Sequence, residues 1–233
     1  MKKIAAVFDL EGTLFKRNSD FMDEIRSNQG RGAKNRMNIG FFNIILLTIF
    51  ILYKLRLLTE QAMRTATIKR FATVLKDSSE KEIIQKANAF AANYMKHLRP
   101  EMRRILEEHK RNGHITILLS GSLQPYIEAI QRELGMDFAK GTQIEIKQSI
   151  YTGQLSEKPY FAQRRAQALK EIVNQIEDEV DLSKSFAYGD AIFDRYFMGM
   201  VGNPVAVYPD KGLAEYAKEH GWEVIGGNTY IED

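Results

Sequence analysis

Short apolar runs separated by helix-forming stretches constrain the fold of this chain more than any other feature. Each run has four or five residues, too few for a buried helix, and is predicted to be a buried strand. Strands that alternate with helices are typical of a mostly parallel sheet covered on both faces. We therefore expect an α/β protein with a doubly wound parallel sheet. The five runs are IAAVF (4–8), ITILL (115–119), SFAYG (185–189), PVAVY (204–208) and WEVI (222–225).

The alternation is interrupted between residues 15 and 96, where the pattern predicts helices and no convincing strand. We interpret this stretch as an all-helical domain inserted after the first strand. Residues 1–14 and 97–233 would then form the α/β core, and 15–96 the inserted domain. The expected helices of the insert span about 40–58, 60–75 and 80–97.

Residues 37–53 (MNIGFFNIILLTIFILY) carry no charge, and basic residues flank them on both sides. A helix that crosses a membrane needs roughly 20 apolar residues, with a lower limit of about 17. This run is at that limit and includes Asn38, Asn43 and Thr48. We favour a helix buried in the inserted domain or facing a partner. Membrane contact, by insertion or along the surface, is the alternative.

Composition narrows the function classes. The chain has no cysteine, so disulfides, thiolate metal sites and cysteine nucleophiles are excluded. Its formal net charge of +3 gives no reason to expect a nucleic-acid partner. The apolar run 4–8 is shorter than the roughly 7–15 residues of a secretory signal. We expect a cytoplasmic protein, with attachment to a membrane surface as the alternative, and the oligomeric state stays open.

Polar side chains follow three of the predicted strands directly. Asp9 and Glu11 come after the first, residues 120–122 (SGS) after the second, and Asp190 and Asp194 after the third. Ligands of open parallel sheets bind at the carboxyl ends of the strands, where these groups would converge. Four carboxylates in one small site repel one another unless a cation lies among them. Oxygen ligands favour Mg²⁺, so the sequence predicts a magnesium site.

The three motifs FDLEGTL, ILLSGS and YGDAIFD resemble those of the haloacid dehalogenase superfamily, in its phosphoserine phosphatase-like branch. The resemblance covers about two thirds of the chain and includes the insert only by its position and helical character. It implies a Rossmann-like core with a helical cap, and it implies phosphatase activity with Mg²⁺ as cofactor.

The resemblance also implies roles for single residues. Asp9 would be the nucleophile and Glu11 the general acid and base. Ser120 and the Gly121 amide would bind the phosphate. Mg²⁺ would be held by Asp9, Asp190 and the Glu11 backbone carbonyl, with Asp194 in support.

The sequence departs from the family pattern at two places. The family usually has Asp where Glu11 stands, but Glu keeps a carboxyl of similar reference pKa, about 4.3 against 3.9.

The third motif, a basic residue near the start of the helix before Asp190, is ambiguous. We favour Arg165 for this phosphate-binding position, because it fits the register of the predicted helix and lies 25 residues before Asp190. An arginine there could bind phosphate with two hydrogen bonds. Lys158 and Arg164 are the alternatives.

The resulting hypothesis is a Mg²⁺-dependent phosphatase that forms an aspartyl-phosphate and acts on a small phosphomonoester such as phosphoserine. Asp20 is a loose match for the acidic residue that binds the ammonium group of serine. The many basic residues beside the run 37–53 leave a second hypothesis open, a membrane-associated phosphatase of a lipid or lysolipid phosphate. A non-catalytic binding protein with this fold and phosphotransfer to an acceptor other than water are further alternatives.

Overall fold

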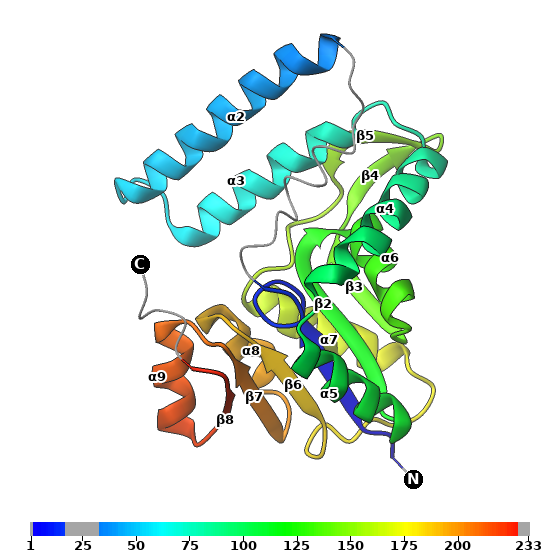
Figure 1. Ribbon diagram of the computed structural model, residues 1–233, viewed down its shortest axis with the longest axis vertical. Coiled ribbons are helices and arrows are strands. Elements are labelled where there is room, and N and C mark those ends of the chain that lie inside the picture. Colours follow the sequence, from blue (N-terminus) through cyan, green and yellow to red (C-terminus); the bar gives the residue numbers. More distant parts are fainter. Residues whose placement is uncertain (1, 17–32, 228–233) are drawn as a thin grey trace.

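The computed structural model describes residues 2–16 and 33–227, and its largest element is a six-stranded parallel sheet (Figure 1). The strand order is β3-β2-β1-β6-β7-β8. The chain enters at β1 in the middle of the sheet, builds one side, and then crosses over to build the other. This order confirms the predicted doubly wound α/β core. The strands are β1 (Ala5–Asp9), β2 (Ile115–Leu123), β3 (Phe138–Thr142), β6 (Phe186–Gly189), β7 (Asn203–Val207) and β8 (Glu223–Ile225).

The edge strand β3 is the one strand of this sheet that the apolar pattern does not predict. Its sequence FAKGT contains Lys140 and Gly141 in place of a continuous apolar run. It pairs only with β2, on one side. An edge strand is less enclosed than a central one and tolerates charged side chains, so its sequence carries a weaker signal.

Two apolar clusters cover the two faces of the sheet. Along β1, Ala6 and Phe8 belong to one cluster and Ala5 and Val7 to the other. This alternation follows from the two-residue period of a strand, and it makes β1 buried on both faces. On the first face lie α5 (Pro100–Arg111) and α6 (Gln124–Leu134). On the second lie α7 (Gln163–Gln175), α8 (Arg195–Met198) and α9 (Lys211–His220).

Helices α2 (Ala33–Lys54) and α3 (Glu60–Ala72) lie side by side beyond the carboxyl ends of the strands (Figure 1). Phe42 of α2 packs edge-on against Phe71 of α3, with ring centroids 5.0 Å apart. The α2 helix ends before the predicted residue 58, because Arg56 adopts a left-handed conformation with φ of 58°. The hydroxyl of Thr59 then caps α3 by accepting a hydrogen bond from the Ala62 amide.

The third helix of the insert, α4 (Glu80–Tyr94), packs against α6 of the core. After β3 the chain forms an antiparallel hairpin of β4 (Ile144–Lys147) and β5 (Ile150–Leu155). An isolated bridge joins Ile150 to Ser79, so the hairpin is tied to the chain just before α4. The position of the domain boundary at residue 96 stays a prediction. Short 3₁₀ turns are η1 (Thr73–Leu75), η2 (Met95–His97) and η3 (Ile192–Asp194).

The apolar run 37–53 lies within α2. Across residues 2–16 and 33–227, no helix combines the length and the apolar character that crossing a membrane requires.

Candidate active site

The parallel pairing brings the ends of β2, β1 and β6 to one edge of the sheet. Asp9 of β1 pairs with Leu119, so Ser120 lies one residue further along the neighbouring strand. Phe8 pairs with Tyr188, which places Asp190 two residues beyond that pair. A cavity of about 270 Å³ opens at this edge. Among its lining residues are seven of the eight predicted site residues: Asp9, Glu11, Ser120, Gly121, Arg165, Asp190 and Asp194.

Three buried carboxylates meet in this cavity. Asp9, Asp190 and Asp194 each offer one oxygen, and these oxygens lie within 4.8 Å of one another. All three residues are at least 97% buried. Asp194 is fixed in place because its Oδ2 accepts hydrogen bonds from the amides of Asp190 (3.1 Å) and Ala191 (3.0 Å).

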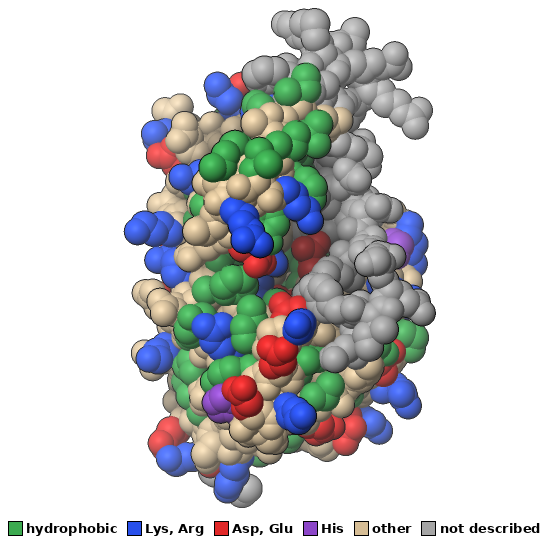
Figure 2. Space-filling model, turned by 90° about the vertical axis from the view of Figure 1, so that its left-hand side faces the viewer, with side chains coloured by type: hydrophobic (Ala, Val, Ile, Leu, Met, Phe, Trp, Pro, Cys, Tyr) green, Lys and Arg blue, Asp and Glu red, His purple; other side chains and the backbone are tan. Residues whose placement is uncertain are grey.

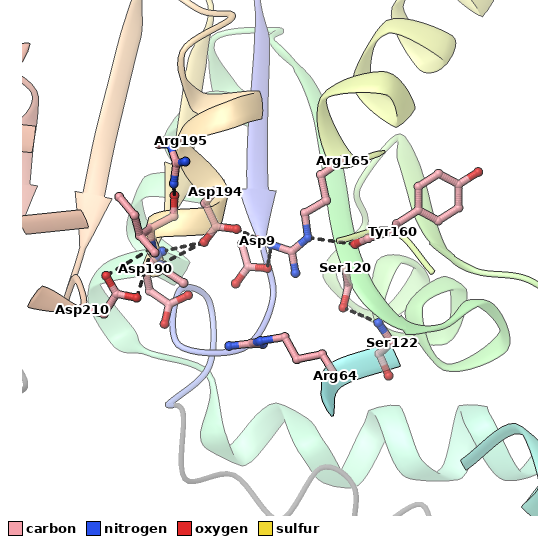
Figure 3. Close-up of polar contacts among 12 residues, drawn as sticks. Asp9, Arg64, Ser120, Ser122, Tyr160, Arg165, Asp190, Asp194, Arg195 and Asp210 are labelled. Carbon is pink, nitrogen blue, oxygen red and sulfur yellow. Dashed lines mark hydrogen bonds and ion pairs between the residues drawn. The ribbon is translucent and has the colours of Figure 1, made fainter. Parts of the chain in front are cut away.

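Arg165 supplies a positive charge to this group from a side chain that is only 12% exposed (Figure 3). Its Nη1 lies 2.7 Å from Oδ1 of Asp9 and 2.5 Å from Oδ1 of Asp194. Burial raises the pKa of Asp9 to about 6, against the opposing effect of Arg165. Burial also disfavours the charged guanidinium, but the neighbouring carboxylates outweigh it and raise the pKa of Arg165. Arg165 therefore stays charged.

The two alternative basic residues lie elsewhere. Lys158 lines a neighbouring cavity between α3 and the segment 153–164. Arg164 lines that same cavity, and its Nη2 pairs with Glu157 at 3.0 Å. Of the three candidates for the third motif, all of them described in the structure, Arg165 is the one that contacts Asp9.

Strand β2, which pairs with β1 on the side away from β6, provides small polar groups near Asp9. The Oγ of Ser120 accepts a hydrogen bond from the Ser122 amide at 3.1 Å. A side chain at Gly121 would overlap the Phe161 ring, because a Cβ there would lie 2.0 Å from it. Gly121 therefore lets the chain pass close to the ring that lines the cavity. Glu11 is half-buried and lines the same cavity.

The turn after β1 depends on Gly12. Its φ of +90° is a conformation that other residues rarely adopt, and a Cβ there would lie 2.0 Å from Oδ2 of Asp190. The carbonyl of Gly12 accepts a hydrogen bond from Nη2 of Arg99 at 3.3 Å. The Arg99 guanidinium also lies 3.9 Å from the centre of the Tyr208 ring. Arg99 thus ties the turn of the first motif to the chain just after β7.

Sequence reasoning missed several residues that shape the site. Arg99 and Gly12 are 87 positions apart, and no local pattern joins them. Asp210 caps α9 and accepts hydrogen bonds from the Ile192 amide at 3.1 Å, which braces the loop after β6. Its position directly before a helix is a signal that could have indicated a cap.

Arg64 reaches the cavity from α3 (Figure 3). Its guanidinium pairs with Glu60 at 2.8 Å.

The donor set fits a hard divalent cation. Three buried carboxylates carry more negative charge than the one buried arginine beside them can balance. Carboxylate oxygens are the ligands that Mg²⁺ prefers, and a small ion would relieve their mutual repulsion. Asp9, Asp190 and Asp194 are therefore the residues that would hold it.

Comparison with known proteins identifies the class of protein that this fold and site define. The haloacid dehalogenase-like hydrolase family matches residues 6–199, and the chain belongs to that family.

Curated relatives support this placement. The chain is 28% identical over 150 residues to a histidinol-phosphatase of Neisseria meningitidis, covering 63% of this chain and 68% of the relative. It is 30% identical over 122 residues to phosphoserine phosphatase SerB1 of Mycobacterium tuberculosis, covering 52% of this chain and 39% of the relative. A probable phosphatase of the same organism is 30% identical over 121 residues, and the match spans 41% of its length. The chain thus spans about two fifths of the mycobacterial relatives that it matches.

Solved structures share the whole fold. A Bordetella pertussis protein of unknown function has a TM-score of 0.77 at 21% identity and covers 97% of this chain and 99% of its own. A substrate-bound phosphoserine phosphatase has a TM-score of 0.63 at 19% identity, covering 98% and 95%. These likenesses confirm the predicted fold class, a Rossmann-like core with an additional cap.

Proposed function

We propose that this protein is a Mg²⁺-dependent phosphatase that hydrolyses a small phosphomonoester through a phosphorylated Asp9. The observation that carries the proposal is the position of Asp9. Its carboxylate is buried at the end of β1, beside the carboxylates of Asp190 and Asp194. It also forms an ion pair with Arg165. Such a carboxylate is fixed in orientation and ready to attack a phosphoryl group bound in the cavity.

The cation would be held by Asp9, Asp190, Asp194 and the backbone carbonyl of Glu11. When bound, it would neutralise the charge between the attacking carboxylate and the phosphate. Arg165 supports the same task from the protein side, because its guanidinium is fixed beside the attacking oxygen. The Ser120 hydroxyl and the Gly121 amide would orient the phosphoryl oxygens at the end of β2. Lys158, in the neighbouring cavity, has no place in this arrangement.

The reaction has two steps. A carboxylate oxygen of Asp9 attacks phosphorus, the bond from phosphorus to the leaving oxygen breaks, and Glu11 donates a proton to that oxygen. Glu11, now ionised, takes a proton from water, whose oxygen attacks phosphorus and displaces the Asp9 carboxylate. Inorganic phosphate leaves and both side chains return to their starting states. Glu11 lines the cavity beside Asp9, as both roles require.

The substrate is proposed only as a class. Phosphoserine remains a candidate, and Asp20, which would bind its ammonium group, lies outside the described residues. Arg64 gives the cap side of the cavity a positive charge, so an anionic group on the leaving alcohol would be favoured there. A lipid or lysolipid phosphate is the second candidate, and the exposed apolar face of α2 favours it.

The direct test is release of phosphate from a generic aryl phosphomonoester, with and without Mg²⁺, by the wild type and Asp9→Asn. Asp178→Asn is the matched control, since Asp178 is a solvent-exposed aspartate outside the cavity. We expect turnover that needs Mg²⁺, is lost in Asp9→Asn and is unchanged in Asp178→Asn. Turnover that survives in Asp9→Asn would contradict the assigned nucleophile.

A further inference from the structure

The outer face of α2 is apolar and exposed in the part of the chain that the structure describes. Of the ten large hydrophobic side chains exposed among the described residues, six belong to α2 and the turn that follows it. Their exposed fractions run from 46% to 68%. Figure 2, which views the side of the molecule where α2 lies, shows hydrophobic side chains gathered in its upper part. The six are Ile44, Leu47, Phe50, Ile51, Leu55 and Leu57.

Ile44, Leu47 and Ile51 lie on one side of the helix, and Leu55 continues their spacing just after its last residue. Positions 44, 47, 51 and 55 are separated by three or four residues, the spacing of a single helix face. The opposite side is used for packing, since Phe42 is buried against Phe71 and Leu46 packs on the core cluster. An apolar stripe of this kind on an otherwise ordinary surface indicates an interaction site.

The charges around the stripe distinguish between the surfaces that could cover it. Between Glu24 and Glu60 the sequence contains six basic residues and no acidic one. Lys54 and Arg56 are exposed at the end of the stripe, and the Lys54 ammonium lies 5.3 Å from the centre of the Phe50 ring. A second copy seated on this face would bring the basic ends of two α2 helices against each other, whether parallel or antiparallel. An anionic surface would instead be complementary.

We propose that α2 docks on an anionic lipid surface, with its apolar stripe in the interface and its basic end among the headgroups. An apolar helix face flanked by cations is the pattern of a helix that lies along a membrane. Such a helix needs no spanning length. The proposal is independent of the catalytic role of Asp9. Its consequence for the enzyme is geometric, because α2 packs along α3, and α3 lines the active-site cavity with Gln61, Arg64 and Ile68.

The test is co-flotation of the full chain with phosphatidylcholine vesicles that contain either no anionic lipid or about a third phosphatidylglycerol, without substrate. We expect binding to the anionic vesicles and weaker binding to the neutral ones. Leu47→Gln/Ile51→Gln should lower the partition coefficient at least about tenfold, since two apolar side chains are removed from the interface. Lys54→Gln should lower it about fivefold, and only on anionic vesicles.

Matched controls separate the stripe from general surface hydrophobicity. Ile84→Gln replaces an isoleucine of α4 that is 46% exposed, as Ile51 is, and should leave binding unchanged. Lys81→Gln removes an exposed cation from α4 and should also have no effect. Sedimentation velocity of the same variants measures whether the chain forms a dimer.

Three results would overturn the proposal. The first is a wild type that floats with neither kind of vesicle. The second is vesicle binding that Ile84→Gln reduces as much as the α2 variant does. The third is a wild type that does not bind vesicles and forms a dimer that Leu47→Gln/Ile51→Gln dissociates. That result would show that the stripe binds a second copy of the chain. Neither flotation nor sedimentation measures hydrolysis, so a negative result in them would not contradict the proposed reaction.

Discussion

Arg165 and Asp9 form a buried ion pair, with Nη1 of the arginine 2.7 Å from Oδ1 of the aspartate. The two residues come from α7 and β1, which are far apart in the chain and adjacent at the carboxyl edge of the sheet. The same nitrogen also contacts Asp194, so one guanidinium holds two of the three clustered carboxylates. The account of the site depends on this contact.

Replacing Arg165 with Met should lower kcat by about 100-fold or more, because a positioned donor beside the reacting group is lost. Arg165→Lys should recover part of the rate, since a charge returns without the fixed geometry of the guanidinium. Lys158→Met is the control and should stay within about twofold, as a surface change away from the site. Steady-state kinetics on one phosphomonoester measures all three. A large loss in Lys158→Met with a small one in Arg165→Met would reverse the assignment of the third motif.

Glu11→Gln should reduce kcat by about 10²- to 10⁴-fold, the usual contribution of general acid and base catalysis. The formation of the phosphoryl-enzyme should suffer less with a nitrophenyl leaving group than with an alkyl one, because nitrophenolate leaves without a proton. Pre-steady-state measurement of both substrates checks this. Equal losses in that step for the two leaving groups would argue that Glu11 does not act as the acid.

Gly12→Ala should abolish activity and destabilise the fold by ~1–3 kcal/mol. The new Cβ would overlap the Asp190 carboxylate, and the backbone conformation is strained for any other residue. Gly113→Ala is the matched control, because Gly113 also has a positive φ, of +69°, but no atom within 4 Å of the added Cβ. It should lose about 1 kcal/mol and keep its activity. Urea unfolding and kinetics on both variants test the difference, and an active Gly12→Ala enzyme would contradict it.

The free energy of unfolding should decrease as the pH is lowered, because of His109. Burial, together with the nearby His114, lowers the pKa of His109 from 6.5 to about 4. The folded state therefore binds fewer protons than the unfolded state between these values. The stabilisation is complete above about pH 6.5 and is lost as pH falls toward 4, a change of about 3 kcal/mol.

The ring of His109 is held by Tyr188, whose hydroxyl lies 2.7 Å from Nε2. His109→Gln should flatten the pH dependence of the unfolding free energy, and His220→Gln, at an exposed position, should not. Urea unfolding at several pH values measures this. An unchanged slope in His109→Gln would show that other groups cause the acid lability.

The sequence allowed the centre of the site to be placed, because Asp9, Ser120 and Asp190 each follow a buried apolar strand, and the ends of parallel strands share an edge. Arg165 could be favoured over Lys158 only from its place near the start of a helix, and the contact with Asp9 required coordinates. Arg99 could not be predicted, since its bond to the first motif depends on tertiary packing alone. β3 was missed because an edge strand does not need a continuous apolar run.

The apolar run 37–53 illustrates a different limit. Its lack of charge predicted a helix correctly, but hydropathy alone did not indicate which side of α2 would pack on α3 and which would stay exposed. That division follows from the position of Phe42 against Phe71, a contact between two helices of the insert.

Phosphorylation of Asp9 can be observed by intact-protein and peptide mass spectrometry after rapid acid quench of the enzyme with substrate and Mg²⁺. Glu11→Gln should accumulate the intermediate, because loss of the base slows its hydrolysis. We expect one added phosphoryl group, located on the peptide that contains Asp9 and absent from Asp9→Asn. Turnover with no phosphorylated enzyme in either the wild type or Glu11→Gln, or a phosphoryl group on another residue, would contradict it.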